Sequence, residues 1–279
     1  HDAAHPTGRF LLGLRTEDDC PVTLQMDLLG RRVAITGAGQ GVGRGLALAF
    51  AAAGAEVLVN DLRVERAEAV VEEALAAGGS ARALPFDVTT YEAVAEAFAA
   101  AGAVDVLINN AGNAGADGFL TGRSFAATEP IDWEPFLRVN LYGVLHCTRA
   151  VLPAMIEQKW GRVVTIVSDA GRTGDPNSAA YATAKAGAAG FTRSIAVEMG
   201  RFGITANNIA LGTMRTPLTE PLWSQPDAPQ AKAILRNYAI RRPGTADDVT
   251  HLAVLLASEH GSWITGQTLP VNGGFSFAL

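Results

Sequence analysis

The distribution of apolar and polar positions along the chain predicts strands and helices that follow one another in turn. Candidate strands lie at 32–36, 55–60, 82–86, 104–108, 162–167, 204–209 and 267–271. Candidate helices lie at 42–53, 64–77, 90–101, 132–158, 178–200 and 246–257. Near-continuous apolar runs such as 163–167 fit strands covered by helices on both faces of a parallel sheet. The alternation therefore predicts an α/β fold, a doubly wound parallel sheet of about seven strands with helices on both faces.

The domain organisation follows from what the pattern lacks. No repeat, linker or low-complexity tract divides residues 26–279, so we expect one domain there. Residues 1–25 precede the first strand and are interpreted as an N-terminal extension of unknown order. In such a sheet the ligand is expected at the carboxyl ends of the strands.

Composition excludes several functional classes. The net charge is −6 and no basic stripe is present, which argues against nucleic acid as a partner. No apolar run approaches the ~20 residues that span a membrane, and no signal peptide is expected. Cys20 and Cys147 lie far apart and lack metal-ligand spacing, which suits a reducing cytoplasm. The five histidines form no ligand cluster, so no metal is expected.

A glycine-rich turn supplies the first candidate chemistry. Thr36-Gly37-Ala38-Gly39-Gln40-Gly41-Val42-Gly43 lies between a strand and a helix, the context that a Rossmann-like dinucleotide site requires. The helix N-terminus would offer N–H groups to a pyrophosphate. Asp61 ends the second strand, where an acid accepts from the ribose hydroxyls of NAD. The alternatives are a βα turn without a ligand, and an N-cap role for Asp61.

Tyr181 and Lys185 are four residues apart on a predicted helix and share one face. A cation beside a phenol favours the phenolate and lowers its pKa, so the pair is a candidate proton donor and acceptor. An ordinary surface pair is the alternative. The glycine turn that precedes the pair in the sequence favours the interpretation as a proton donor and acceptor.

Taken in order, these motifs resemble the short-chain dehydrogenase/reductase family in its compact single-domain form. The resemblance covers roughly 27–279 and includes the glycine turn, Asn109-Asn110-Ala111-Gly112, and Tyr181-x-x-x-Lys185. It further includes Asp87, Asn140, Ser168 and the ending Val271-Asn272-Gly273-Gly274. The family implies that NAD is bound by Gly37, Gln40, Gly41, Val42, Asp61, Asp87, Val88, Asn110, Gly112, Met214 and Thr216, together with Tyr181 and Lys185.

The resemblance also implies four catalytic residues. Ser168 would bond the substrate carbonyl, and Tyr181 would transfer the proton. Lys185 would hold the nicotinamide ribose and lower the pKa of Tyr181, and Asn140 would position a water beside Lys185. The alternatives are a turn or N-cap for Ser168 and a helix-bending role for Asn140. A capping sequence is likewise an alternative for Asp87-Val88-Thr89.

One departure from the family is visible after the sixth strand. The family usually has Pro-Gly-x-x-x-Thr there, whereas this chain has Leu211-Gly212-Thr213-Met214-Arg215-Thr216. The entry to the loop therefore loses the fixed φ of proline.

Residues 212–242, called the lid below, should determine the substrate. The lid is broken by prolines and rich in large apolar groups, which favours a small apolar alcohol or ketone. Packing on a neighbouring subunit is the alternative for this segment. The lid also contains five cations, Arg215, Lys232, Arg236, Arg241 and Arg242. They would either bind the phosphates of a CoA or carrier-protein thioester or form a solvated face.

We therefore predict an NAD-dependent oxidoreductase that interconverts a secondary alcohol and a ketone, with a 3-hydroxyacyl thioester or an alicyclic or steroid-like alcohol as examples. A non-catalytic NAD-binding regulatory protein and a sugar-nucleotide epimerase or dehydratase remain alternatives. Family members that resemble this chain pair their long helices, so a homotetramer is expected.

Overall fold

The computed structural model describes residues 27–113, 123–225 and 227–277, and the extension expected at 1–25 lies outside them. Its centre is a seven-stranded sheet in the order β3-β2-β1-β4-β5-β6-β7. All neighbouring strands are parallel, which confirms the predicted fold class. The strands are β1 Arg32–Ile35, β2 Glu56–Val59, β3 Ser80–Ala83, β4 Val106–Asn109, β5 Gly161–Ser168, β6 Ile204–Leu211 and β7 Thr268–Val271.

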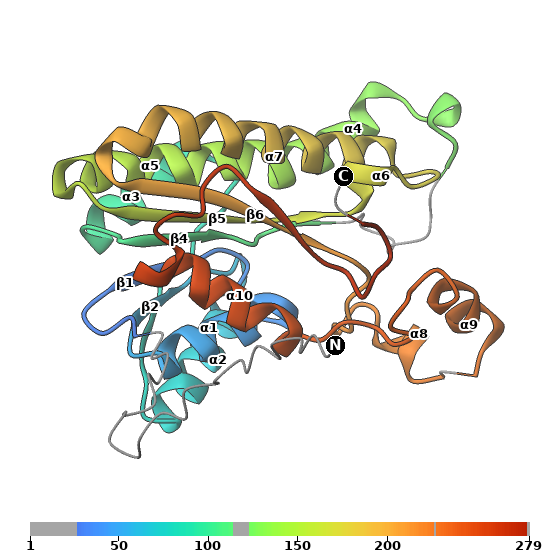
Figure 1. The fold of residues 1–279 in the computed structure, drawn as a ribbon, viewed down its shortest axis with the longest axis horizontal. Helices are drawn as coiled ribbons and strands as arrows, with labels where there is room; N and C mark the ends of the chain where they lie inside the picture. Colours follow the sequence, from blue (N-terminus) through green and yellow to red (C-terminus); the bar gives the residue numbers. More distant parts are fainter. Residues whose placement is uncertain (1–26, 114–122, 226, 278–279) are drawn as a thin grey trace, which may run out of the picture.

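Helices cover both faces of the sheet (Figure 1). They are α1 Gly41–Ala52, α2 Val64–Ala76, α3 Tyr91–Ala101, α4 Pro130–Leu137, α5 Gly143–Gln158, α6 Ala170–Thr173, α7 Ala179–Met199, α8 Glu220–Trp223, α9 Pro229–Leu235 and α10 Asp247–Ala257. Shorter turns are the 3₁₀ helices Phe125–Ala127, Gly200–Phe202 and Glu259–Gly261 and the π-helical turn Arg138–Tyr142. Helices α1, α2 and α10 lie on one face, and α3, α5 and α7 lie on the other.

The core is divided by the sheet into two layers, because successive side chains of a strand point to opposite faces. In β1, Val33 and Ile35 are buried in the cluster with α1, α2 and α10. Ala34 points the other way and joins the cluster that α3, α5 and α7 contribute to. The sheet is therefore buried on both faces, as its apolar runs predict.

Two predicted elements differ from the structure. The strand expected at 82–86 is Ser80–Ala83, because Pro85 has no N–H for a ladder and the pairing to β2 starts earlier. The single helix expected at 132–158 is two helices, α4 and α5, joined by the π-helical turn at Arg138–Tyr142. A π-helical turn within a helix often lies at a functional site.

The carboxyl ends of the strands meet at one edge of the sheet, where α6, α8 and α9 lie (Figure 1). The strand order reverses between β1 and β4, and a doubly wound fold binds its ligand at such a switch point. Within the described parts of the chain, no helix is long and apolar enough to cross a bilayer.

Candidate active site

Three of the predicted catalytic side chains meet at the carboxyl edge of the sheet. Ser168 is the last residue of β5, and its hydroxyl is hydrogen-bonded to the phenol of Tyr181 on α7. Lys185 lies one turn further along α7, with Nζ 5.9 Å from the centroid of the Tyr181 ring. The i, i+4 spacing therefore places both groups on the helix face that is directed at the end of β5.

The expected lowering of the Tyr181 pKa by Lys185 is wrong for this structure. Burial raises the pKa of Tyr181 above its ordinary value, the bond from Ser168 opposes that rise, and the Asp175 carboxylate adds to it. Lys185 does not compensate, because its Nζ donates to the carbonyl of Ile166 at 2.9 Å. Burial also lowers the pKa of Lys185 to about 8, so the ammonium stays mostly charged at neutral pH and loses its charge above pH 8.

Asn140 lies fully buried in the π-helical turn, beside the same site. Its side-chain amide donates to the carbonyls of Asn113 at 2.8 Å and Phe136 at 3.0 Å, and its Oδ1 accepts from the Asn113 N–H at 3.3 Å. A Cβ built on Gly112 would lie 3.0 Å from Asn140 Oδ1 and 3.3 Å from Lys185 Nζ. Asn140 thus lies in the helix break and also adjoins Lys185, so its two proposed roles are compatible.

The glycine turn has the geometry that a pyrophosphate requires. Gly37 and Gly41 have φ values of +61° and +57°, a region that favours glycine. Helix α1 starts at Gly41 behind the exposed N-cap Gln40, which makes no side-chain capping bond. The first-turn N–H groups have no acceptor within the helix, so they are directed at any anion that lies over the turn. Val42 is buried beneath this turn.

Asp61 lies against the glycine turn rather than capping α2. Its carboxylate accepts from the N–H of Gly39 at 3.1 Å and from the N–H of Arg63 at 3.0 Å, and α2 starts at Val64 with no side-chain cap. A Cβ built on Gly39 would lie 2.6 Å from both the Asp61 carboxylate and the Cβ of Arg66. These residues fit a dinucleotide, with an uncapped helix end for the pyrophosphate and an acid where the adenosine ribose would lie.

The predicted adenine residues occupy the turn after β3. Asp87 accepts from the N–H of Thr89 at 2.8 Å, whereas the N-cap of α3 is Thr90. Val88 is buried nearby. Asn110 donates to the carbonyls of Thr36 at 2.9 Å and Gly37 at 3.0 Å. Asn110 therefore ties the end of β4 to the glycine turn and shapes the cofactor site from behind.

Met214 and Thr216 lie in the loop that leaves β6. Met214 forms a parallel bridge with Gly244 and is buried. A Cβ built on Gly41 would lie 3.3 Å from Thr216 Cγ2, so Thr216 lies directly over the glycine turn. The loop thus runs from the end of β6, beside Ser168, to the phosphate side of the predicted cofactor site.

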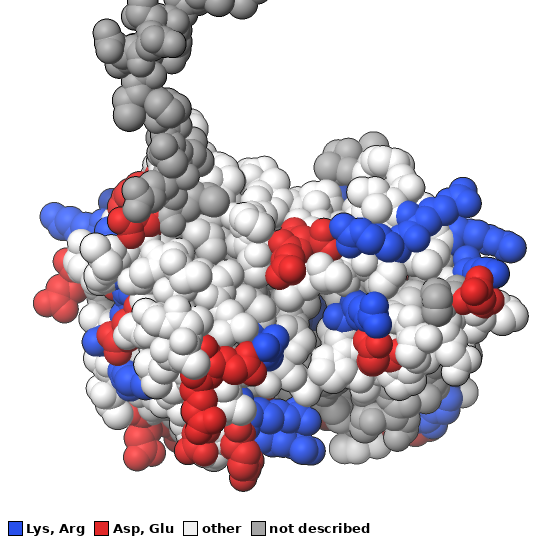
Figure 2. Space-filling view, turned by 90° about the horizontal axis from the view of Figure 1, so that it is seen from below, with Lys and Arg blue, Asp and Glu red and all other residues white. Residues whose placement is uncertain are grey.

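The lid contains α8 and α9, both of which begin with a proline in the first turn. Three of its five cations are paired, Arg215 with Glu220 at 2.6 Å, Lys232 with Asp227 at 2.9 Å and Arg242 with Asp248 at 2.7 Å. Figure 2 views the molecule from below Figure 1 and shows acidic and basic side chains next to one another on the face that α1, α2 and α10 cover. These pairs favour a solvated face over a phosphate-binding cluster.

Sequence reasoning missed a buried network next to Ser168. Asp169, 2 % exposed, contacts Arg172 at 2.6 Å and the Asn272 amide at 2.5 Å. Arg172 also donates to the Ser276 hydroxyl at 2.9 Å. An acid directly after a strand end was the available signal, but its partner Asn272 lies 103 positions later in the chain. Among the described residues, no group of three or more His, Cys, Asp or Glu side chains is arranged to hold a metal.

Comparison with known proteins gives consistent matches over nearly the whole chain. A family model described as enoyl-(acyl carrier protein) reductase matches residues 37–276. A (2S)-[(R)-hydroxy(phenyl)methyl]succinyl-CoA dehydrogenase subunit of Thauera aromatica is 36% identical, over 90% of this chain and 98% of that protein. A 3-oxoacyl-[acyl-carrier-protein] reductase of Synechocystis is 38% identical, over 89% of this chain and 98% of that protein.

A solved structure agrees with these matches. A gluconate 5-dehydrogenase of Burkholderia cenocepacia, in complex with NADP and tartrate, superposes with a TM-score of 0.82 at 33% identity. The superposition covers 91% of this chain and 98% of that chain. The likeness therefore extends over most of the chain.

Proposed function

Because the chain belongs to the short-chain dehydrogenase/reductase family and is an oxidoreductase, we propose that it interconverts a secondary alcohol and a ketone with NAD. The observation that carries the proposal is the hydrogen bond between Ser168 and Tyr181 at the end of β5, with Lys185 and Asn140 beside it. A non-catalytic nucleotide-binding protein would have no need for this arrangement of donors.

The cofactor, when bound, accepts the hydride from the alcohol carbon or returns it to the ketone. Tyr181 takes the hydroxyl proton during oxidation and gives it back during reduction. Ser168 donates to the substrate oxygen, where negative charge develops. Lys185 and the Asn140 turn lie behind Tyr181, where they would bind the ribose and a connecting water. Burial raises the Tyr181 pKa, and the Lys185 ammonium would oppose that rise if it turned from the Ile166 carbonyl toward the phenol.

We propose NAD rather than NADP as the cofactor. The Asp61 carboxylate lies 7 % exposed beside the glycine turn, where a 2′-phosphate would meet a negative charge. The second candidate is NADP, because Arg66 approaches Gly39 and Arg63 follows Asp61 closely. The gluconate 5-dehydrogenase that resembles this chain was solved with NADP, so a direct comparison of the two cofactors is required.

We propose an apolar secondary alcohol as the substrate. The lid buries Trp223 and Ala231 and leaves Leu218 and Ile240 more than half exposed. A CoA or carrier-protein thioester is the second candidate, since two relatives carry such substrates in their names. The paired cations of the lid weigh against a phosphate-rich carrier.

We propose a homotetramer in the cytoplasm. The support is an exposed apolar surface on the two long helices of one face, where Val197 on α7 is 86 % exposed and Tyr142 precedes α5 at 46 %. Light scattering during size-exclusion chromatography tests this proposal, and a single monomeric mass would contradict it.

The decisive experiment is the absorbance of reduced nicotinamide with a panel of secondary alcohols. Turnover of at least one alcohol is expected, and Tyr181→Phe should reduce kcat by about 10²–10⁴-fold because the proton acceptor is lost. Trp263→Phe, which changes an aromatic side chain that is 97 % exposed, is the control and should leave kcat unchanged. A Tyr181→Phe enzyme that kept more than about a tenth of the rate would refute the assigned role.

A further inference from the structure

The loop after β6 leaves the sheet without a proline to fix its direction. Leu211 pairs with Ser168 and Val271, and the N–H of the next residue, Gly212, donates to the Val271 carbonyl at 3.3 Å. Beyond Gly212 the loop leaves this ladder. Its later part is held by Gly244, whose carbonyl accepts from the Arg215 N–H at 2.7 Å.

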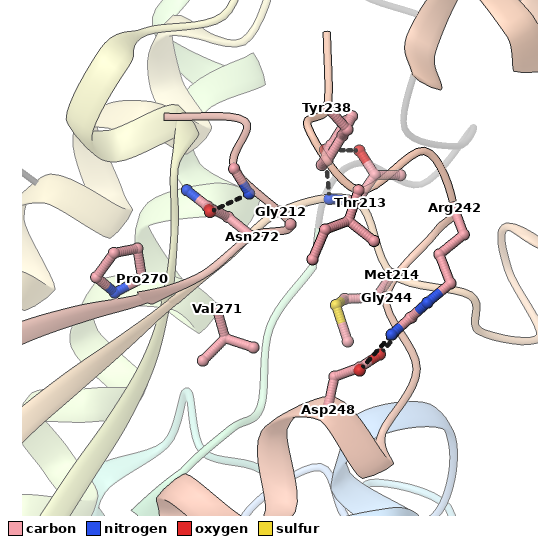
Figure 3. A pocket seen from close by; sticks show the side chains of 13 residues that line it. Gly212, Thr213, Met214, Tyr238, Arg242, Gly244, Asp248, Pro270, Val271 and Asn272 are labelled. Atoms are coloured by element: carbon pink, nitrogen blue, oxygen red, sulfur yellow. Dashed lines mark hydrogen bonds and ion pairs between the residues drawn. The ribbon is translucent and has the colours of Figure 1, made fainter. Parts of the chain in front are cut away.

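Between these two anchors the Thr213 carbonyl accepts from the Gly244 N–H at 3.0 Å and the Met214 carbonyl accepts from the Thr219 hydroxyl at 2.7 Å. The N–H and the hydroxyl of Thr213 are bound by Tyr238. The phenol oxygen accepts from the N–H of Thr213 at 2.7 Å and donates to the Thr213 hydroxyl at 2.8 Å (Figure 3). Tyr238 is 6 % exposed and follows α9 in the lid. A single phenol therefore makes both a backbone and a side-chain bond to the first residue that leaves the sheet.

The Tyr238 ring is itself held in a narrow space. A Cβ built on Gly212 would lie 3.0 Å from its Cε1, and one built on Gly273 would lie 3.3 Å from its Cδ1. Phe275 packs against it with the ring centroids 5.1 Å apart. The ring is thus fixed by the C-terminal segment, so the position of its hydroxyl is well defined.

Close packing does not hold the loop from this side. A cavity of about 320 Å³ lies behind Gly212, Thr213 and Met214, lined further by Arg242 and Asn272 (Figure 3). Without the phenol, the Thr213 N–H would lack its acceptor and the loop would have room to shift into this cavity. The direction of the loop at Thr213 thus depends on two sets of hydrogen bonds, those with Tyr238 and the one from Gly244.

We infer that Tyr238 is a positioning residue that sets the nicotinamide end of the cofactor by fixing the Thr213 backbone next to Met214. The inference rests on the proposed function and on the family resemblance, which implies that Met214 and Thr216 bind the nicotinamide amide. The adenosine end would be held separately, by Asp61 and the turn at Asp87. Tyr238 should therefore influence one half of the cofactor and leave the other half unaffected.

The test compares calorimetric binding of NAD and of ADP-ribose, which lacks the nicotinamide, to the wild type and to Tyr238→Phe. We expect the affinity for NAD to fall by about five- to tenfold, because both bonds of the phenol to Thr213 are lost, while that for ADP-ribose stays within about twofold. The kcat should fall by about 10- to 100-fold, because a small misplacement of the reacting ring is costly. Trp263→Phe, at a side chain that is 97 % exposed, should change none of these values.

Equal affinities of the wild type and Tyr238→Phe for NAD would overturn the inference, and so would an equal loss for NAD and ADP-ribose. If Tyr238→Phe does not fold, Thr213→Val decides, since it removes only the hydroxyl partner. It should weaken NAD about twofold or more without changing ADP-ribose binding, and unchanged NAD binding would reject the inference. A wild type that binds neither compound would instead contradict the proposed function.

Discussion

Lys185 should destabilise the folded protein at neutral pH, and Lys185→Met should therefore raise the free energy of unfolding. Burial lowers the Lys185 pKa from its ordinary 10.5 to about 8, and its ammonium donates a hydrogen bond to the Ile166 carbonyl at 2.9 Å. Methionine has a similar length and no charge to desolvate. The cost of burying the ammonium is thus removed, and one hydrogen bond is lost.

The magnitude and the pH window follow from the two pKa values. Below pH 8 the lysine is protonated in both states and the full burial cost applies, about 3 kcal/mol for this pKa difference. Between pH 8 and 10.5 the unfolded state binds more protons, so wild-type stability rises with pH and the cost disappears. After about 1 kcal/mol for the lost bond, Lys185→Met should be more stable by about 2 kcal/mol at pH 7.

Urea unfolding at one protein concentration, from pH 6.5 to 9.5, measures this difference. The advantage of Lys185→Met should shrink by about 2 kcal/mol over that range. The exposed Lys232→Met is the control, and its stability should stay within about 0.5 kcal/mol of the wild type at each pH. A stability difference for Lys185→Met that did not vary with pH would refute the reasoning, whatever its size. The variant should meanwhile lose turnover, since a functional lysine is retained at the expense of stability.

Two further variants test the cofactor end and the opposite edge of the sheet. Asp61→Ala should reduce the ratio of kcat/KM for NAD to kcat/KM for NADP by about 10- to 100-fold. The variant loses a charge-assisted bond to the ribose of NAD and no longer repels the 2′-phosphate of NADP. A ratio unchanged from wild type would contradict the NAD assignment. Trp160→Ala should lower the free energy of unfolding by about 3–4 kcal/mol without changing kcat, because the indole lies between the guanidinium groups of Arg31, at 3.6 Å, and Arg162, at 4.3 Å. For Trp160→Ala, urea unfolding measures the free energy of unfolding and initial rates measure kcat. A large loss of kcat with an unchanged free energy of unfolding would contradict the prediction.

The strands whose positions the sequence predicted well are those that are buried on both faces of the sheet. The apolar run at 162–167 becomes β5, Gly161–Ser168, because burial on both faces leaves a signal that requires no partner to be known. The strand β3 was misplaced because Ser80–Ala83 has no apolar run, and it is a strand through its backbone pairing to β2. The break in the long helix was also missed, since Asn140 bonds to Asn113, a contact that helical periodicity does not encode.

The properties of the candidate site also divide into those that local sequence patterns predict and those that depend on tertiary packing. Local rules placed Tyr181 and Lys185 on one helix face and Ser168 at a strand end, and the structure brings all three together. The direction of the Tyr181 pKa was predicted wrongly, because it depends on burial and on Asp175, neither of which follows from i, i+4 spacing. Titration behaviour is a property of the packed site, whereas residue identity and spacing are properties of the chain.

The loop after β6 shows how far a departure in a motif can be interpreted. Leu211 in place of proline indicates that the loop needs another restraint, and the sequence alone does not name it. The residue that supplies it, Tyr238, lies in a proline-broken segment with no periodicity, and its ring fits only because Gly212 and Gly273 lack side chains. Substituting either glycine should therefore resemble Tyr238→Phe in its effect on the cofactor. A restraint lost within a motif is thus replaced by a tertiary contact, which connects the C-terminal segment to the loop beside Ser168.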